Sequence, residues 1–472
     1  MDASLAFLDG PTPSALLASS PWTLPMTFIV ALSVFWAFLL PLITLKSTLP
    51  PQKPKLKRRM TSTGLTTLLT ETETNQSILF TMTILDKIIT RETFVEHLRP
   101  RFDSEFFVRF RSIIVGRSFV LEESFDVDDH VHFHTLAEGE TAHSYAESLN
   151  NAPLDPSKPL WAVHLVHEDG KTYALWRSHH CLGDGQSMAM FFLKLCDNGH
   201  EIEAPGAAAP EAKIPLVTRL VLIAWSIALY LYKVVRTFGI PESTQFFKRP
   251  GHTKKHLAYS LNMSVDETKA VGKKLKASIN DVMLSSVASA LHQLVPESER
   301  SSKMFIRAGI PISMRPSSDP FVTTSNAFSS LLIDLPIGDT DGVRRTKKVV
   351  AAMRDAKFSL EKDITLLLTK FLSLLPEAVM VPMARLMASR VSVAVTNVRG
   401  PPNEFYLAGA KIIHSLGFVP PPPSVNIGIA ITSVGNTLGV TAATDKSIDA
   451  SFLIRAIESE FQVLKATVMA DN

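Results

Sequence analysis

The residues with the clearest chemical potential are two adjacent histidines, His179 and His180, in the stretch SHHCLGDGQSM at residues 178–188. An imidazole acts as a general base when one ring nitrogen faces a cleft and a hydrogen bond holds the other. The preceding residues, ALWRSHH, alternate as in a β-strand, so the two rings are expected to point to opposite faces. The pattern therefore predicts that only one of the two histidines faces a given site.

Asp184 and the glycines on either side of it predict a tight turn after this strand. Gly183 and Gly185 supply the backbone freedom for the turn. Asp184 is expected to orient the turn through hydrogen bonds or to pair with an arginine elsewhere. Apolar residues at helical spacing then predict a helix behind the strand: Met188, Phe191, Phe192 and Leu195.

A metal site is the alternative chemistry for these histidines. Side chains on opposite faces of a strand do not easily bind one ion, and Asp184 adds at most one ligand. A second cluster, HVHFH, is expected to place three histidines on one strand face: His130, His132 and His134. Such a row is also typical of a solvated face, and no carboxylate spacing nearby completes a known site. We therefore expect no metal.

Composition narrows the remaining classes of function. The net charge is only +3, and basic residues are mostly interspersed with acidic ones, which argues against nucleic-acid binding. The two cysteines, Cys181 and Cys196, cannot build a disulfide framework, so a reducing compartment is expected. The chain has no Gly-rich phosphate loop and no serine-centred nucleophile elbow. Direct transfer to an acceptor activated by a base is therefore favoured over a covalent enzyme intermediate.

The 472 residues suffice for two domains of roughly 150 residues and a tail. The stretch EIEAPGAAAPEAK at 201–213 is typical of a linker. We expect four parts: a tail with a membrane helix and polybasic segment at 1–59, a first half at 60–200, a linker with an apolar helix at 201–250, and a second half at 251–472.

The second half shows both kinds of periodicity. SINDVMLSSVASALHQL predicts a helix with Ser278 as its N-cap. Four segments predict strands: 304–314, 329–337, 391–398 and 425–434. Because strands and helices mix without strict alternation, we expect a mixed α/β (α+β) fold and not a Rossmann sheet.

Several motifs together resemble one family. HHCLGDG has the HHxxxDG form of the coenzyme A-dependent acyltransferase and condensation-domain superfamily. More narrowly, the chain resembles the wax ester synthase/diacylglycerol acyltransferase family. The supporting motifs, in chain order, are FDVDDHV (125–131), PLW (159–161), NDV (280–282), PISMR (311–315) and TNVRGP (396–401).

The resemblance implies two chloramphenicol-acetyltransferase-like subdomains with the active site at their interface. It implies that His180 is the general base and that His179 and Asp184 hold the turn. The candidates for stabilising the oxyanion or lining the tunnel are Asn280, Asp281, Thr396 and Asn397. For Asn280 and Asp281, capping of the helix is the alternative role.

Four residues depart from the family pattern: Cys181, Gly183, Ser325 and Arg399. They leave the base in place but put the choice of substrate in doubt. The implied partners are acyl-CoA as a substrate, a long-chain alcohol or diacylglycerol as the acceptor, and a lipid bilayer, with no cofactor. The alternative is a non-catalytic acyl-CoA or lipid-binding scaffold of the same fold.

The segment at 24–45 is uncharged over 22 residues, which suffices for one transmembrane helix. Basic residues follow it, and no acidic residue lies between residue 45 and Glu71. The positive-inside rule then places the large body in the cytosol, and we expect a single-pass protein of the endoplasmic reticulum. The alternative is an apolar segment bound into a protein core.

A second apolar stretch, LVLIAWSIALYLY at 220–232, is short for a membrane span. Basic residues flank it, and Trp225, Tyr230 and Tyr232 lie within it. This composition suits a helix in the membrane interface. A second crossing and a buried core helix remain open.

Overall fold

The computed structural model describes residues 57–73, 75–199, 216–248, 254–316, 323–400 and 403–470. The predicted membrane helix at 24–45 and the linker at 201–213 lie outside these residues. Among the residues described, no helix is long and apolar enough to cross a membrane. Residues 56–472 form one compact unit.

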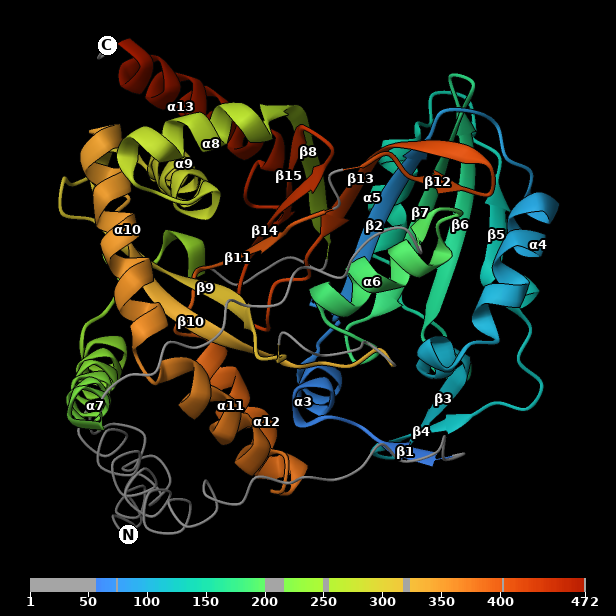
Figure 1. Ribbon diagram of the computed structural model, residues 1–472, viewed down its shortest axis with the longest axis horizontal. Coiled ribbons are helices and arrows are strands. Elements are labelled where there is room, and N and C mark those ends of the chain that lie inside the picture. The colour runs from blue at the N-terminus through green and yellow to red at the C-terminus, as the bar shows by residue number, and fades with distance from the viewer. Residues whose placement is uncertain are drawn as a thin grey trace, which may run out of the picture. The chain divides into compact units, whose positions relative to one another are not determined.

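A six-stranded sheet forms the core of the first half (Figure 1). Its spatial order is β12 (Tyr406–Leu407), β13 (Ala410–Phe418), β2 (Ile78–Leu85), β7 (Lys171–His179), β6 (Trp161–Glu168) and β5 (Val131–His134). Neighbouring strands are antiparallel except for β5 and β6. Two of the six strands, β12 and β13, thus come from the far end of the chain.

A second six-stranded sheet organises the other half. Its order is β10 (Phe328–Leu335), β9 (Ile306–Ser313), β11 (Val393–Val398), β14 (Ile427–Val434), β15 (Thr437–Asp445) and β8 (Lys255–Ser264). Strand β11 runs parallel to both β9 and β14, and the other pairs are antiparallel. The four strands predicted in this half are β9, β10, β11 and β14, so the period-two patterns were interpreted correctly.

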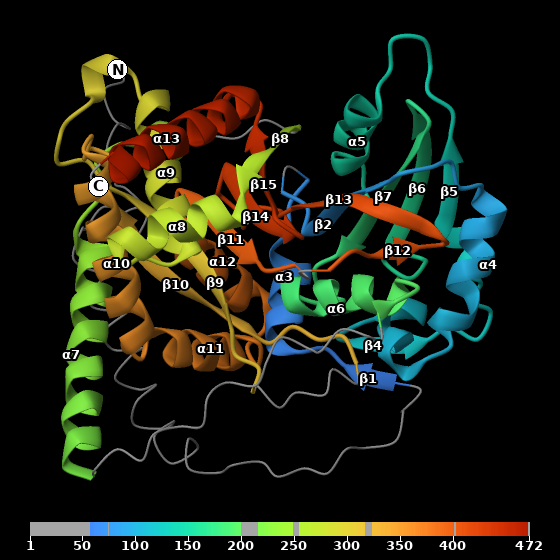
Figure 2. The same cartoon turned by 45° about the horizontal axis from the view of Figure 1, so that its top comes forward.

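Helices cover these sheets, as Figures 1 and 2 show. In the first half they are α3 (Ser62–Thr70), α4 (Arg91–Phe102), α5 (Ala142–Asn150) and α6 (Gly185–Leu195). In the second half they are α7 (Leu216–Gly239), α8 (Val265–Leu275), α9 (Ile279–Leu294), α10 (Gly342–Phe358), α11 (Glu361–Leu372), α12 (Glu377–Ala388) and α13 (Ala450–Ala470). The predicted helix with Ser278 as its N-cap is α9.

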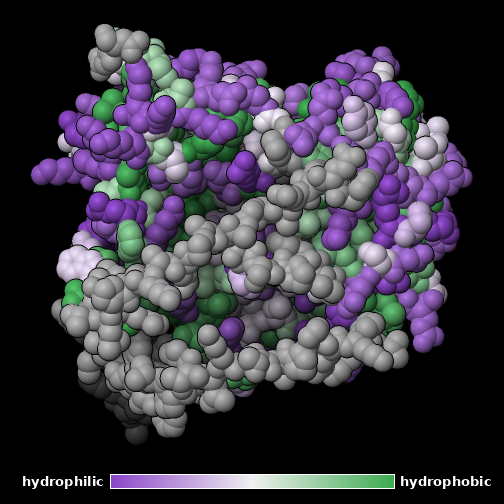
Figure 3. Space-filling view, viewed as in Figure 1, coloured by the Kyte–Doolittle hydropathy of each residue, from purple (hydrophilic) through white to green (hydrophobic). Residues whose placement is uncertain are grey.

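The two halves share part of their hydrophobic core. One buried cluster joins Phe80 of β2 and Phe418 of β13 to Leu257 of β8 and Ala443 of β15. Because this cluster draws on both sheets and β13 pairs with β2, the halves at 60–200 and 251–472 share a hydrophobic core and a sheet. In the view of Figure 3, hydrophilic residues cover much of the described surface.

A small third sheet lies at the start of the first half. Residues 57–59 form a strand, β1 (Lys57–Arg59), which pairs with β4 (Ser118–Leu121), so the body begins before residue 60. β4 also pairs with β3 (Ser112–Val115) in the same sheet. The FDVDDHV segment contains a 3-10 helix at Val127–His130, and β5 begins at its last residue, Val131.

Candidate active site

The HHxxxDG turn joins β7 to α6, as predicted. His179 is the last residue of β7 and pairs in register with Ile78 of β2, and the His180 backbone N–H donates to Ser77 O at 2.7 Å. The predicted alternation holds along β7. Trp176 packs in the hydrophobic core of the first half, on one face of the sheet, and Leu175 packs on the other face, in the cluster that both halves share. The two imidazoles consequently contact different partners.

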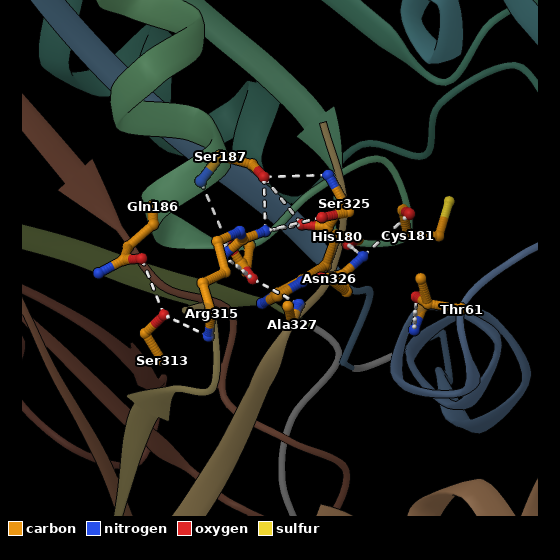
Figure 4. A network of polar contacts seen from close by, with 12 residues as sticks. Thr61, His180, Cys181, Gln186, Ser187, Ser313, Arg315, Ser325, Asn326 and Ala327 are labelled. Carbon is orange, nitrogen blue, oxygen red and sulfur yellow. Dashed lines mark hydrogen bonds and ion pairs between the residues drawn. The ribbon is translucent and has the colours of Figure 1, made fainter. Parts of the chain in front are cut away.

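His180 is held by Asn326, a residue of the other half of the chain (Figure 4). The imidazole Nδ1 lies 3.1 Å from Asn326 Oδ1. Asn326 Nδ2 donates to the carbonyl oxygens of His180, at 2.8 Å, and of Cys181, at 3.0 Å. Because two carbonyl acceptors engage the amide nitrogen, the amide oxygen must face the ring. His180 therefore carries its proton on Nδ1, which leaves the lone pair on Nε2.

The surroundings of His180 favour a neutral ring. The side chain is partly buried, and its ring lies 5.4 Å from that of Phe328. Burial lowers the pKa of His180 below its usual value, which outweighs the opposite effect of Asp184. A neutral imidazole with a free nitrogen is the form in which histidine accepts a proton.

His179 is buried and makes only supporting contacts. Its Nε2 lies 3.2 Å from Glu71 Oε2, and its Nδ1 accepts the Cys181 backbone N–H at 3.1 Å. Burial lowers the pKa of His179, while the Cys181 thiol and the Glu71 carboxylate raise it, and the net shift is upward. Hydrogen bonds from His179 and Ser77 bring the pKa of Glu71 below its usual value despite burial, so this carboxyl is charged. His179 thus ties the turn to Glu71.

Asp184 pairs with an arginine, one of its two predicted roles. Its carboxylate accepts two hydrogen bonds from Arg315 Nη1, at 2.8 and 2.7 Å, and one from the Ala327 N–H at 2.7 Å. Asp184 is also the N-cap of α6 and accepts from the Ser187 N–H. Figure 4 shows Arg315 beside Ser187 and Ser325, to which it also donates. Asp184 therefore joins the turn to the second sheet.

The two glycines of the turn are required by space and not, as expected, by backbone freedom. Neither has a positive φ. A β-carbon at Gly183 would lie 2.8 Å from Cβ of Ser187, and one at Gly185 would lie 3.1 Å from Cγ2 of Val398. Larger residues would push α6 away from the turn and from β11.

The four oxyanion candidates fall into two places. Thr396 and Asn397 are at the end of β11, just before Val398, whose contact with Gly185 brings this strand end against the start of α6. Asn280 and Asp281 are in the first turn of α9, which packs on α8, α10 and α13. Asp281 forms a capping box with Ser278, so its hydrogen bonds are those of the alternative capping role.

The three histidines of HVHFH do not share a strand face. His130 belongs to the 3-10 helix, where its Nδ1 contacts Trp161 O at 2.8 Å. His132 lies beside His164 of β6, and His134 stacks on Tyr145. The prediction of three aligned rings was therefore wrong. Within the described ranges, no group of three or more potential ligands could hold a metal ion.

Sequence reasoning missed several residues that hold the site. Arg315 was noticed only as the end of PISMR, and Asn326 only as the residue after the departing Ser325. Glu71 carried no signal, because its partner His179 is 108 residues away. These contacts arise when the loop between β9 and β10 and the segment after α3 meet the HHxxxDG turn.

Asn326 gives a first prediction, for a residue that positions the base. Asn326→Asp places a carboxylate beside His180 Nδ1, which stabilises the charged ring. The pKa of His180 should therefore rise, and the acid limb of the pH dependence of kcat/KM should move up by about 1–3 pH units. An unchanged acid limb in a folded variant would show that Asn326 does not set the protonation of His180.

Comparison with known proteins agrees with this architecture. The family model described as the wax ester synthase/diacylglycerol acyltransferase catalytic domain matches residues 57–213, and the WS/DGAT C-terminal domain matches residues 324–465.

Among curated relatives, the wax ester synthase/diacylglycerol acyltransferase 11 of Arabidopsis thaliana is 25% identical over 59% of this chain and 66% of that protein. The wax ester synthase/diacylglycerol acyltransferase 5 of the same plant is 28% identical over 37% of this chain. The alignment covers 42% of that relative, so less than two thirds of either plant protein is matched.

Two solved structures share the fold at 15% sequence identity. The wax ester synthase/diacylglycerol acyltransferase from Marinobacter aquaeolei VT8 superimposes with a TM-score of 0.63, over 87% of this chain and all of that one. The first condensation domain of the CDA synthetase gives 0.56, over 88% of this chain and 96% of that one. Both domain models of one family match in order along the chain, the first over the range that contains His180 and the second over the range that contains Asn326, so the chain belongs to the wax ester synthase/diacylglycerol acyltransferase family.

Proposed function

We propose that this protein transfers a fatty acyl group from acyl-CoA to the hydroxyl of a long-chain alcohol, of diacylglycerol or of both, with His180 as the general base. The observation that carries the proposal is the hydrogen-bonded clamp of Asn326 on His180, which leaves Nε2 able to accept a proton. The names of the relatives support the class of substrate.

The proposed reaction needs no covalent enzyme intermediate. His180 Nε2 takes the proton of the acceptor hydroxyl while its oxygen attacks the thioester carbonyl. The carbon–sulfur bond then breaks, and the imidazolium returns the proton to the thiolate of coenzyme A. Thr396 and Asn397 are our candidates to stabilise the oxyanion, because their strand end abuts the start of α6. No cofactor takes part in these steps, and acyl-CoA is a substrate.

The test is an assay of the purified full-length chain with radiolabelled palmitoyl-CoA and either hexadecanol or dioleoylglycerol. We expect labelled ester and stoichiometric release of free coenzyme A with at least one acceptor. Saturable binding of acyl-CoA without ester formation would favour the alternative, a non-catalytic scaffold. The ratio of the two products gives the acceptor preference.

We further propose that the segment at 24–45 anchors the protein in the endoplasmic reticulum with the body in the cytosol. Acyl-CoA is a bulky anion that does not cross a bilayer, so the site must face the compartment that holds it. Protease added to sealed reticulum vesicles is expected to digest the region around His180 and to spare the short N-terminal tail. Protection of the body would overturn this orientation.

A further inference from the structure

Helix α7 turns its polar side chains toward the protein. Ser226 Oγ donates to Phe358 O at 2.8 Å, and Lys233 donates to Leu332 O at 3.0 Å and pairs with Glu361. Ser226, Tyr230 and Thr237 are buried, and Arg236 pairs with Asp334. These inward residues recur at the spacing of one helical face. Polar contacts therefore fasten α7 to β10 and to the start of α11.

The opposite face of α7 is apolar and exposed. Its members follow the same helical spacing half a turn away: Val221, Trp225, Ala228, Tyr232 and Val235. Four of these are among the most exposed large apolar side chains described, at 62%, 62%, 60% and 69% for Val221, Trp225, Tyr232 and Val235. We call these five residues the outer face. Figure 2 shows α7 as a long helix along one edge of the second half.

In α7 the polar side chains face the protein and the apolar ones face outward, which is the reverse of the arrangement in an ordinary surface helix. An amphipathic helix of a water-soluble protein buries its apolar stripe and hydrates its polar one. An aligned row of large exposed apolar side chains marks a surface that meets an apolar partner. The buried-core alternative for this segment is thus wrong, since the apolar stripe is not in the core.

The chemistry of the outer face fits a lipid surface. It carries Trp225 and Tyr232, whose rings suit the boundary between water and hydrocarbon. The sequence has no charge between Arg219 and Lys233. The 24 residues of α7 extend over roughly 36 Å, enough to lie along a bilayer surface. The inward contacts with Phe358, Leu332, Glu361 and Asp334 prevent α7 from inserting across the bilayer without detaching.

We infer that the outer face of α7 docks the body on a phospholipid bilayer, with the helix parallel to the membrane plane. This inference rests on the proposed function in one respect, because acceptors with long chains are drawn from a lipid phase. Docking through α7 brings the acyltransferase body against that phase independently of the segment at 24–45.

Fluorescence of Trp225 tests the inference in the full chain. Trp22→Phe and Trp36→Phe leave three tryptophans, of which Trp161 and Trp176 are buried in the first-half core. Phosphatidylcholine vesicles brominated close to the headgroups should quench most of the Trp225 emission, and bromines near the chain ends should quench less. Adding Trp225→Phe should abolish the quenching. The measurement uses no acyl-CoA, so failure of acyl transfer does not affect it.

A matched control places the reporter on another exposed apolar site. Val463 of α13 is 59% exposed, a fraction similar to the 62% of Val221 and Trp225. Among the described residues, however, no aligned row of exposed apolar side chains lies beside it. Val463→Trp in the background without Trp225 should show no quenching by brominated vesicles. Equal quenching at both sites would indicate nonspecific adsorption and overturn the inference.

Two other outcomes would also overturn it. Stronger quenching of Trp225 by bromines near the chain ends would mean that α7 crosses the membrane. In the absence of lipid, iodide in the buffer should quench Trp225 equally at all protein concentrations. Quenching by iodide that weakens as the protein concentration rises would mean that a second copy covers the outer face. As a second variant, Tyr232→Asp with Val235→Asp should reduce the brominated-lipid quenching of Trp225 at least severalfold without lowering the thermal midpoint, since both side chains are exposed.

Discussion

Replacing His180 by alanine should lower kcat/KM for acyl transfer by about 100-fold to 10,000-fold, the range for loss of a general base. The ring is held by Asn326 with its free nitrogen available, whereas the neighbouring His179 contacts Glu71. Initial rates measured with saturating acceptor and varied acyl-CoA give the size of the loss. Thermal unfolding of the variant should stay close to that of the parent, since the His180 side chain is only partly buried.

His179→Ala is the matched control for this prediction. His179 contacts Glu71 and the Cys181 N–H on the other face of the strand, so its removal should loosen the turn and lower the rate less than loss of His180 does. Glu71→Gln should weaken the turn in the same way and to a smaller extent. Equal losses for the two histidine variants, both folded, would contradict the assignment of His180 as the base.

Arg315→Met should reduce the free energy of unfolding by about 3–5 kcal/mol, because it leaves the Asp184 carboxylate buried without its cation. The two side chains of the pair are 4% and 6% exposed, with a closest approach of 2.7 Å. Urea unfolding followed by circular dichroism measures the loss. Activity should fall with it, since the same pair holds the HHxxxDG turn against the second sheet.

Arg99→Met is the control for the ion pair. Arg99 pairs with Asp126 at 3.3 Å, but both side chains are about half exposed, so its loss should cost less than about 1 kcal/mol. Similar losses for the Arg99 and Arg315 variants would show that burial of the Asp184 pair does not add to its strength. A stable but inactive Arg315 variant would instead indicate a role limited to positioning the turn.

Local sequence patterns predicted the elements of the site but not their partners. The alternation of ALWRSHH predicted different surroundings for His179 and His180, because side-chain period two is a property of one strand. The two rings contact Glu71 and Asn326, respectively. The sequence also showed the two glycines of the turn. Glycine is required at these positions because Ser187 and Val398 lie too close for a side chain, and this proximity depends on tertiary packing.

Long-range contacts lay beyond the reach of those patterns. Asn326 meets His180 across 146 residues, and Arg315 meets Asp184 across 131. The mixed α/β class followed from periodicity, whereas the transfer of β13 to the first sheet did not. A strand of nine residues has the same period in either sheet, so its sequence does not say which edge it will join.

The transfer of β13 has a consequence for synthesis on the ribosome. Until residues 410–418 leave the exit tunnel, β2 remains an open sheet edge with most of its side chains apolar, although β5, β6 and β7 of its sheet have already been made. The partners Asp86 and Lys411 are 325 residues apart, so this edge stays unpaired for most of translation. An exposed, unpaired edge is a template for misassociation. Nascent chains that stall before β13 should therefore depend on chaperones, and release of that dependence should coincide with emergence of residue 418.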